Sequence, residues 1–149
     1  NTTRGTVENS STILTVLTNP QTFSVFVGEL YTTGLRSMVE KNTGERQQIT
    51  LIAPTDEAMN KFGRIGALRE TPELLKSFLQ FHMLEGRRDR KYLRAHKTVK
   101  TMANGRNLNT SQIGEILYSI DTVNGIIHVT TSTVLHPDVK KQLRIKDTP

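Results

Sequence analysis

The 149-residue sequence contains no cysteine and no tryptophan, and aromatic residues make up only 5% of it. Without cysteine, the chain can form neither a disulfide bridge nor a thiolate metal site. No apolar run approaches the roughly 20 residues that a membrane-spanning helix needs. The chain is nevertheless long enough to bury a sizeable core. We therefore expect a single domain that folds without disulfide bridges and has no membrane span.

Catalytic patterns are absent as well. The sequence has no G-x-S-x-G nucleophile turn, no H-E-x-x-H metal motif and no glycine-rich phosphate loop. Of its four histidines, His82 follows an apolar helical stripe and His128 lies within an apolar strand pattern. Such positions favour buried, hydrogen-bonded histidines over metal ligands, which would have to converge in threes or fours. The sequence therefore predicts a protein that is not an enzyme and that uses no cofactor, metal or small-molecule substrate.

The start of the chain does not directly indicate the localisation of the protein. It does not begin with Met and carries no signal peptide, so we expect a processed or excised piece whose targeting segment has been removed. Three N-glycosylation tripeptides begin at Asn1, Asn9 and Asn109. They are compatible with an extracellular protein, in which these asparagines would be candidate glycosylation sites.

The stretch from Ile49 to Phe62 is the organising element that the sequence predicts. Its first residues are apolar almost without interruption, as in a strand that is covered on both faces. Pro54 cannot donate a hydrogen bond to a neighbouring strand and so ends this one. Thr55 is a good N-cap, and the two acids after it suit the positive end of a helix dipole. We expect a buried strand that turns directly into a short helix, with Phe62 in the core, where truncation to alanine would cost about 3–5 kcal/mol if the ring is fully buried.

Helical patterns dominate the first half of the chain. After a short helix near residues 13–17, a helix that begins at residue 20 or 22 shows one apolar face and a C-cap glycine at Gly34. The residues of that face recur at helical spacing and are Phe23, Phe26, Val27, Leu30 and Tyr31. A later helix is predicted by its start, Thr71-Pro72-Glu73, and by the apolar stripe that leads to His82.

Strand patterns dominate the second half. Asn104-Gly105 predicts a tight turn between two short strands, and Asn124-Gly125 predicts a hairpin turn between two longer ones. On the return strand Ile127 and Val129 share one face, while His128 lies on the other. Helices followed by hairpins favour the α+β class, with helices packed on a largely antiparallel sheet.

Three blocks of the sequence resemble the signature segments of one known family. They run from Thr50 to Phe62, from Leu79 to Gly86, and from Asn124 to Pro137, the last containing Asn-Gly-Ile-Ile-His-Val and Val-Leu-His-Pro. In order and spacing they resemble the fasciclin-like adhesion domain family, over roughly Ser10 to Pro137. The resemblance implies an α+β fold in which two β-sheets, mostly antiparallel, form a wedge packed with several short helices.

The same resemblance sets the expected boundaries and the expected role. The domain would cover residues 10–137, with a flexible segment over 1–9 before it and a basic tail over 138–149 after it. The implied function is that of a non-catalytic adhesion or interaction module that is extracellular, at the cell surface or periplasmic. The implied partners are cell-surface or matrix proteins, or acidic polysaccharides.

Four residues match positions that carry adhesion or structural roles in this family. Phe81 and His82 stand in the tyrosine–histidine segment, where phenylalanine replaces the usual tyrosine and removes a hydroxyl. His128 lies in the closing strand. Asp121 supplies the acid of an Asp-Ile pair that is linked to integrin binding in some members, but here isoleucine precedes the acid. The resemblance therefore implies adhesion or structural roles for these four residues without extending to integrin recognition.

Positive charge is concentrated in one segment, residues 87–100. Seven basic residues and one acid give this segment a net charge of +6, which equals the net charge of the whole chain. Arginine forks fit sulfate, carboxylate and phosphate groups, so the segment is a candidate polyanion site that resembles heparin-binding segments. Its basic residues are Arg87, Arg88, Arg90, Lys91, Arg94, Lys97 and Lys100.

Two alternatives to glycan binding stay open for this segment. Tyr92 and His96 are interleaved with the basic residues, as in proteins that stack nucleic-acid bases, so nucleic acid or another polyanion is the alternative partner. A solvated loop with surplus charge is the simplest alternative, and it would carry no binding function.

Overall fold

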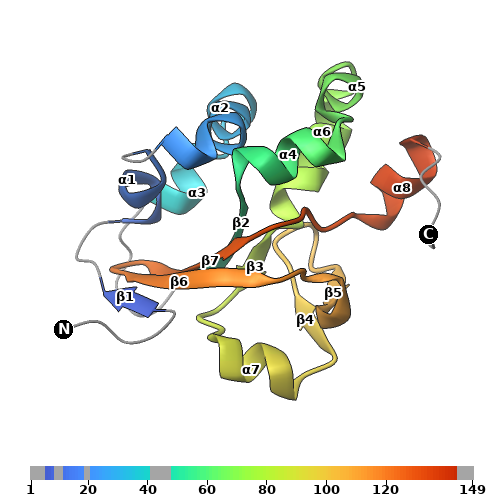
Figure 1. Cartoon of the computed structure of the whole chain (residues 1–149). Helices are drawn as coiled ribbons and strands as arrows, with labels where there is room; N and C mark the ends of the chain where they lie inside the picture. Colours follow the sequence, from blue (N-terminus) through green and yellow to red (C-terminus); the bar gives the residue numbers. More distant parts are fainter. Residues whose placement is uncertain (1–5, 9–11, 19–20, 41–47, 144–149) are drawn as a thin grey trace.

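The computed structural model describes residues 6–8, 12–18, 21–40 and 48–143. Helices α1 to α6 lie on one side of a five-stranded sheet, and α7 lies on the other side with strands β4 and β5 (Figure 1). In chain order the elements are β1 (Thr6–Glu8), α1 (Ile13–Thr18), η1 (Gln21–Phe23), α2 (Ser24–Thr33), α3 (Arg36–Glu40), β2 (Ile49–Pro54), α4 (Asp56–Phe62), α5 (Ile65–Arg69), α6 (Pro72–Gln80), β3 (Met83–Glu85), α7 (Arg90–Ala95), β4 (Thr98–Lys100), β5 (Asn107–Asn109), η3 (Thr110–Gln112), β6 (Ile116–Thr122), β7 (Gly125–Thr130) and α8 (Pro137–Leu143).

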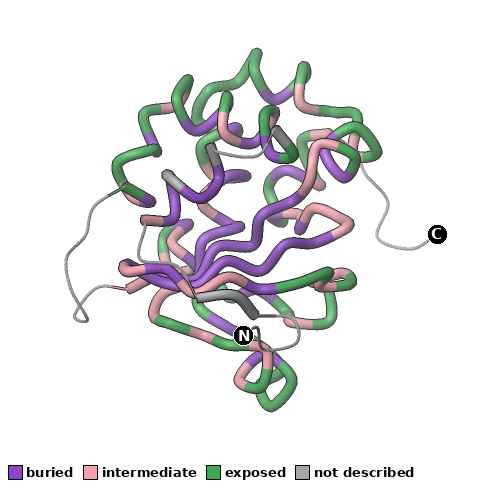
Figure 2. Tube along the Cα trace, turned by 60° about the vertical axis from the view of Figure 1, so that its left-hand side comes forward, coloured by how far each residue is buried: buried purple, intermediate pink, exposed green. Residues whose placement is uncertain are grey.

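The strands form two sheets, as predicted. The larger sheet has the order β1-β6-β7-β2-β3, and β4 and β5 form a separate two-stranded sheet. Three strand pairs are antiparallel (β2–β3, β4–β5 and β6–β7), and two are parallel (β1–β6 and β2–β7). The central strands β2 and β7 are buried along their whole lengths (Figure 2). The expected α+β fold, with mostly antiparallel pairing and several short helices, is confirmed.

Side chains that alternate along the strands build two separate cores. One face of the sheet meets helices α1 to α6 and contributes Leu51, Ala53, Ile127 and Val129 to the larger core. The opposite face contributes to a smaller core beneath α7 and the β4–β5 hairpin, whose members include Ile52, Leu84, Leu93, Val99 and Leu108. The basic segment therefore packs on the smaller hydrophobic core, on the far side of the sheet from most helices.

The stretch from Ile49 to Phe62 folds as predicted, apart from its last residue. The Thr55 side chain accepts a hydrogen bond of 3.2 Å from the Ala58 N–H and so caps α4. Phe62 is only half-buried and stacks on Phe78 at 4.9 Å between ring centroids. The ring covers the core from outside rather than lying within it, so the condition of full burial attached to the expected 3–5 kcal/mol is not met.

The apolar face predicted for α2 is buried at three of its five residues, whereas Val27 is half-buried and Tyr31 is exposed. Phe23, Phe26 and Leu30 are at most 1% exposed, whereas Tyr31 is 53% exposed. The prediction for Tyr31 is wrong because each helical residue turns by about 100°, which places this side chain past the edge of the buried stripe. The helix ends at Gly34, whose φ of 77° confirms the predicted C-cap.

Both predicted turns are present, the second shifted by one residue. The Asn104-Gly105 turn has φ values of 54° and 70°, as a tight hairpin turn requires. The longer hairpin turns at Val123-Asn124 rather than at Asn124-Gly125, since Thr122 pairs with the residue at position 125. The glycine at 125 already lies in β7, where the backbone of β2 approaches closely.

Ordered structure extends beyond both predicted domain boundaries. Residues 6–8, within the segment expected to be flexible, form β1 and pair with residues 119–121 of β6. The helix α8 begins at Pro137, and its Val139 is fully buried. The first part of the predicted basic tail therefore belongs to the fold, while residues 1–5, 9 and 144–149 lie outside the described residues.

Candidate interaction site

The basic segment of residues 87–100 divides into two parts in the structure. Arg87 and Arg88 follow β3 and are hydrogen-bonded to the sheet. The other five basic residues lie on α7, on β4 or between them, and are here called the α7–β4 cations: Arg90, Lys91, Arg94, Lys97 and Lys100.

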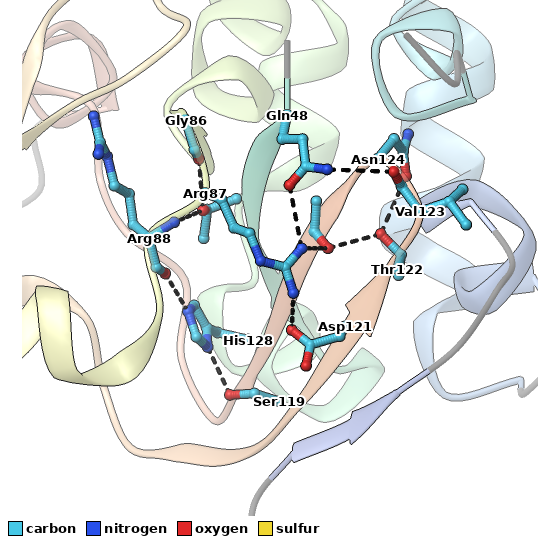
Figure 3. Close-up of polar contacts among 12 residues, drawn as sticks. Gln48, Gly86, Arg87, Arg88, Ser119, Asp121, Thr122, Val123, Asn124 and His128 are labelled. Carbon is cyan, nitrogen blue, oxygen red and sulfur yellow. Dashed lines mark hydrogen bonds and ion pairs between the residues drawn. The ribbon is translucent and has the colours of Figure 1, made fainter. Parts of the chain in front are cut away.

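The Arg87 side chain connects strands β6 and β7 with the residue that precedes β2 (Figure 3). Its guanidinium donates to the Asp121 carboxylate in β6, to the Gly125 carbonyl at 2.7 Å and to the Gln48 side-chain oxygen at 3.3 Å. A residue expected to bind a polyanion and a residue expected to mediate adhesion therefore bind each other. The positive charge of Arg87 and the negative charge of Asp121 are therefore largely neutralised by each other within the fold.

Arg88 is tied to the sheet mainly through its backbone (Figure 3). Its N–H donates to the Thr50 hydroxyl at 2.6 Å, and its carbonyl accepts from His128 Nε2 at 2.8 Å. Its side-chain Nε donates to the Glu85 carbonyl at 3.0 Å, and the guanidinium lies 4.5 Å from the centroid of the Tyr92 ring. Arg88 thus connects β2, β3, β7 and α7.

His128 lies at the centre of this network, between β6 and the Arg88 backbone. Because Nε2 faces a carbonyl oxygen it carries the proton, and Nδ1 then accepts from the Ser119 hydroxyl at 2.7 Å. Burial lowers the pKa of His128 below its ordinary value, and the hydrogen bond to Arg88 opposes this shift. Both His128 and Ser119 are 0% exposed, so no external ligand reaches them.

Phe81 and His82 are also enclosed. His82 Nδ1–H donates to the Phe78 carbonyl at 2.9 Å, and Nε2 accepts from the Val134 N–H at 3.1 Å. Burial lowers the pKa of His82 to about 4. Phe81 is 2% exposed and meets the His136 ring edge-on at 5.2 Å. Within this chain the pair fixes α6 to the sheet and to the segment before α8.

The α7–β4 cations differ from most other arginines of the described chain in having no acidic partner. Lys91, Arg94, Lys97 and Lys100 are exposed, and none of them forms an ion pair with a described residue. Elsewhere the ion pairs are Arg36–Glu40, Arg69–Glu29, Arg87–Asp121 and Arg106–Asp138. Lys61, Arg64 and Lys76 are likewise exposed and form no ion pair with a described residue, so the α7–β4 cations are set apart by standing close together, all five between positions 90 and 100.

The aromatic residues between these cations contact one another. The Tyr92 and His96 rings stack at 3.8 Å with an interplanar angle of 14°. The Arg88 guanidinium also lies over the Tyr92 ring. Tyr92 is thus engaged within the fold, which leaves less of its ring for stacking on a nucleic-acid base.

Residues 21–143 match the family model of the Fasciclin domain. The chain belongs to the fasciclin domain family. The resemblance seen in the three sequence blocks is therefore confirmed. Fasciclin domains are typically adhesion modules of the cell surface or extracellular space.

A solved structure supports the fold of this fasciclin domain. A FAS1 domain pair from the insect cell adhesion molecule fasciclin I aligns with a TM-score of 0.62 at 14% sequence identity. The alignment covers 87% of this chain and 52% of that one, so this fasciclin domain spans about half of the domain pair. At this identity the likeness concerns the fold alone. A search of curated protein sequences gave no match.

Three other features bear on the site. No described helix is long and apolar enough to cross a membrane. Within the described ranges, no three His, Asp or Glu side chains come together in a way that could hold a metal ion. Of the glycosylation tripeptides, Asn1 and Asn9 lie outside the described residues, whereas Asn109 is exposed at the end of β5.

Sequence reasoning missed two residues that shape the site. Asp89 caps α7 by accepting from the Tyr92 N–H at 2.8 Å, and an aspartate just before a helix is a signal that could have predicted this. Thr110 holds the far end of α7 by donating to the His96 carbonyl at 2.7 Å. That contact spans 14 positions and has no local signal in the sequence.

Proposed function

We propose that this fasciclin domain is a non-catalytic adhesion module that acts outside the cytoplasm and binds acidic polysaccharide through the α7–β4 cations. The partner would be a glycan of the cell surface or extracellular matrix, or a protein that carries one. Arg87 and Arg88, which charge alone placed in the polyanion site, serve the fold in this proposal.

The observation that carries the proposal is the lack of acidic partners around the α7–β4 cations. Lys91, Arg94 and Lys97 stand within seven positions of one another, are exposed, and form no ion pair with described residues. Clustered charges of one sign raise the local concentration of a polyanion and speed its encounter. Four other arginines, Arg36, Arg69, Arg87 and Arg106, are paired with acids, so the same attraction is weaker there.

The non-catalytic part of the proposal is supported by the placement of the chemically capable side chains. Ser119 and His128 touch, but both are fully buried. His82 is enclosed between Phe26, Phe78 and the Val134 backbone. A nucleophile or general base must reach its substrate within about 3 Å, and these groups are closed to solvent.

Binding to immobilised heparin tests the proposal. The wild-type domain is compared with the triple variant K91Q/R94Q/K97Q at about 0.15 M salt, where exposed charges are screened beyond ~8 Å. We expect the variant to bind at least about tenfold more weakly, because three unpaired cations are lost. Wild-type affinity should fall as salt is raised.

The matched control is the triple variant K61Q/R64Q/K76Q. It removes the same charge from exposed positions on and beside α4 and α6, on the other side of the sheet. It should retain close to wild-type binding. Equal loss in both variants would mean that only net charge matters, and affinity that does not respond to salt would exclude a charge-based site. Stronger binding to single-stranded DNA than to heparin would favour the nucleic-acid alternative.

A further inference from the structure

A small open pocket lies beside the α7–β4 cations. Its volume is about 350 Å³, at the lower end of the ~300–1,000 Å³ of ligand pockets. One wall comes from α7 and the other from the segment that runs from η3 into β6. The side chains that line the pocket are those of Arg90, Leu93, Arg94, Thr110, Ile113 and Ile116.

Two arginines stand together in the α7 wall. Arg90 and Arg94 are four positions apart, so both side chains lie on the same face of α7. Neither side chain forms a hydrogen bond or an ion pair with a described residue. Arg90 is also half-buried, and charged groups that lose solvent are usually paired. An anion between the two guanidinium groups would supply the missing partner.

The opposite wall of the pocket is apolar with one hydroxyl. Ile113 and Ile116 pack against the small core to which Leu93 belongs, so their positions are fixed by the fold. The Thr110 hydroxyl donates to backbone carbonyls, and its oxygen can still accept a hydrogen bond. This combination suits a ligand with an anionic group, an apolar face and a hydroxyl.

The geometry points to a binding site for one acidic hexose unit, either a uronate or a sulfated sugar. Its carboxylate or sulfate would lie between Arg90 and Arg94, and the apolar face of its ring would lie against Ile113 and Ile116. A sugar hydroxyl would donate to Thr110. This inference rests on the proposed function and deepens it, because the pocket would hold one unit of the chain that the remaining α7–β4 cations attract.

Methyl NMR of the full chain tests the pocket directly. The probes are a sulfated heparin-derived disaccharide, the neutral disaccharide chitobiose and inorganic sulfate. We expect saturable shifts of the Leu93, Ile113 and Ile116 methyl groups with the acidic disaccharide, and none with chitobiose. Sulfate should bind at least about tenfold more weakly, because it leaves the apolar wall uncovered. Equal affinity for sulfate would show an anion site only and overturn the hexose assignment.

Matched variants separate the pocket from general attraction. R90Q and R94Q should each weaken disaccharide binding about tenfold, since each removes a charge-assisted fork. K97Q removes an equal charge outside the pocket and should change binding less than about twofold. R94K keeps the charge but loses the bidentate geometry, and should also weaken binding. Equal losses in K97Q and R94Q would overturn the inference.

A pocket-filling variant distinguishes this inference from the proposed function. I113F adds bulk without changing charge, and its fold is checked by its melting temperature. It should abolish disaccharide binding while long heparin is still retained in a salt-dependent way. Heparin binding without methyl shifts at the pocket would reject the hexose site and leave the proposed function intact. If the wild-type domain does not bind heparin at all, the proposed function itself is rejected.

Discussion

Arg87 and Asp121 form an ion pair between the end of β3 and strand β6, 34 positions apart in the chain. The side chains are 37% and 25% exposed, and the same guanidinium donates to the Gly125 carbonyl. We expect R87M to lower the free energy of unfolding by about 1 kcal/mol, because solvent screens a partly exposed pair while the carbonyl loses its donor. Urea denaturation measures the loss.

The control for R87M is R36M. Arg36 pairs with Glu40 along α3, and the two side chains are 48% and 50% exposed. Its loss should lower the free energy of unfolding by less than about 0.5 kcal/mol. R87M should also retain heparin binding when measured below its unfolding transition. A stable R87M variant that no longer binds heparin would show that Arg87 belongs to the binding site, and would contradict a purely structural role for this residue.

The difference between Thr55 and Arg87 illustrates what this sequence can predict. The Thr55 cap acts over three positions, so the pattern of neighbouring residues was sufficient to identify it. Likewise, strand alternation correctly separated Ile127 from His128. The partner of Arg87 is set by how β6 returns beside β3, which no local pattern encodes. The sequence therefore predicted the fold class and the elements with clear local patterns, but it did not predict β1, α7 or α8, and it counted Arg87 among the binding residues.

The candidate site depends on tertiary structure for the same reason. The sequence marked all seven basic residues of 87–100 alike, since charge count cannot tell an exposed cation from a paired one. The pocket between Arg94 and Ile113 needs two segments that meet only in the folded chain. The burial of residues at the edge of a helix face was also misjudged, as Tyr31 shows. Helical spacing predicts which side of a helix faces the core, but not how far the neighbouring elements cover that side.

His82 should make the domain less stable in acid. Its pKa is about 4 in the folded state because it is buried, against about 6.5 when unfolded. The unfolded state therefore binds more protons between these values, and stability is lost as pH falls from 6.5 towards 4. This residue alone would account for about 3 kcal/mol of that loss. The pKa values of His128 and His136 are also lowered by burial, so they act in the same direction.

Urea midpoints measured from pH 7 to pH 4 check this prediction. H82L should show a shallower decline with falling pH, because one titrating group is gone, although its stability at pH 7 is lower. L17A serves as the control: Leu17 lies on α1 in the same core, and the variant keeps His82 and the rings that enclose it, so its pH dependence should match that of the wild type. Wild-type stability that stays constant over this range would contradict neutral burial of His82.

Asn124 connects the hairpin to two helices. Its side-chain oxygen accepts from the Ile13 N–H at 2.9 Å, and its amide donates to the Val39 carbonyl at 3.0 Å. Asn124 is 2% exposed, so N124A would leave the Ile13 N–H and the Val39 carbonyl buried and without their hydrogen-bond partner. We expect a loss of about 2–4 kcal/mol and faster hydrogen exchange at the Ile13 amide. N60A, at an exposed position in α4, should change the free energy of unfolding by less than about 0.5 kcal/mol.

Phe62 and Phe78 stack on each other but differ in burial. Phe78 is 0% exposed, whereas Phe62 covers it from the solvent side and is only half-buried. F78A should therefore cost about 3–5 kcal/mol, the range first expected for F62A. F62A should cost about 2 kcal/mol, because less apolar surface is lost and water can occupy the space. A larger loss for F62A than for F78A, measured by thermal melts, would contradict this order.

Two glycines should respond to alanine in opposite directions. At Gly125 an added Cβ would lie 1.9 Å from the Ile49 carbonyl oxygen, because the backbones of β7 and β2 meet there. G125A must push the two central strands apart and should cost about 3 kcal/mol. Gly28 lies in α2, where an added Cβ would have nothing within 4 Å, so G28A should stabilise the domain by about 0.5–1 kcal/mol. Opposite shifts of the melting temperature confirm both; a tolerated G125A would mean that the β2–β7 contact is looser than the structure shows.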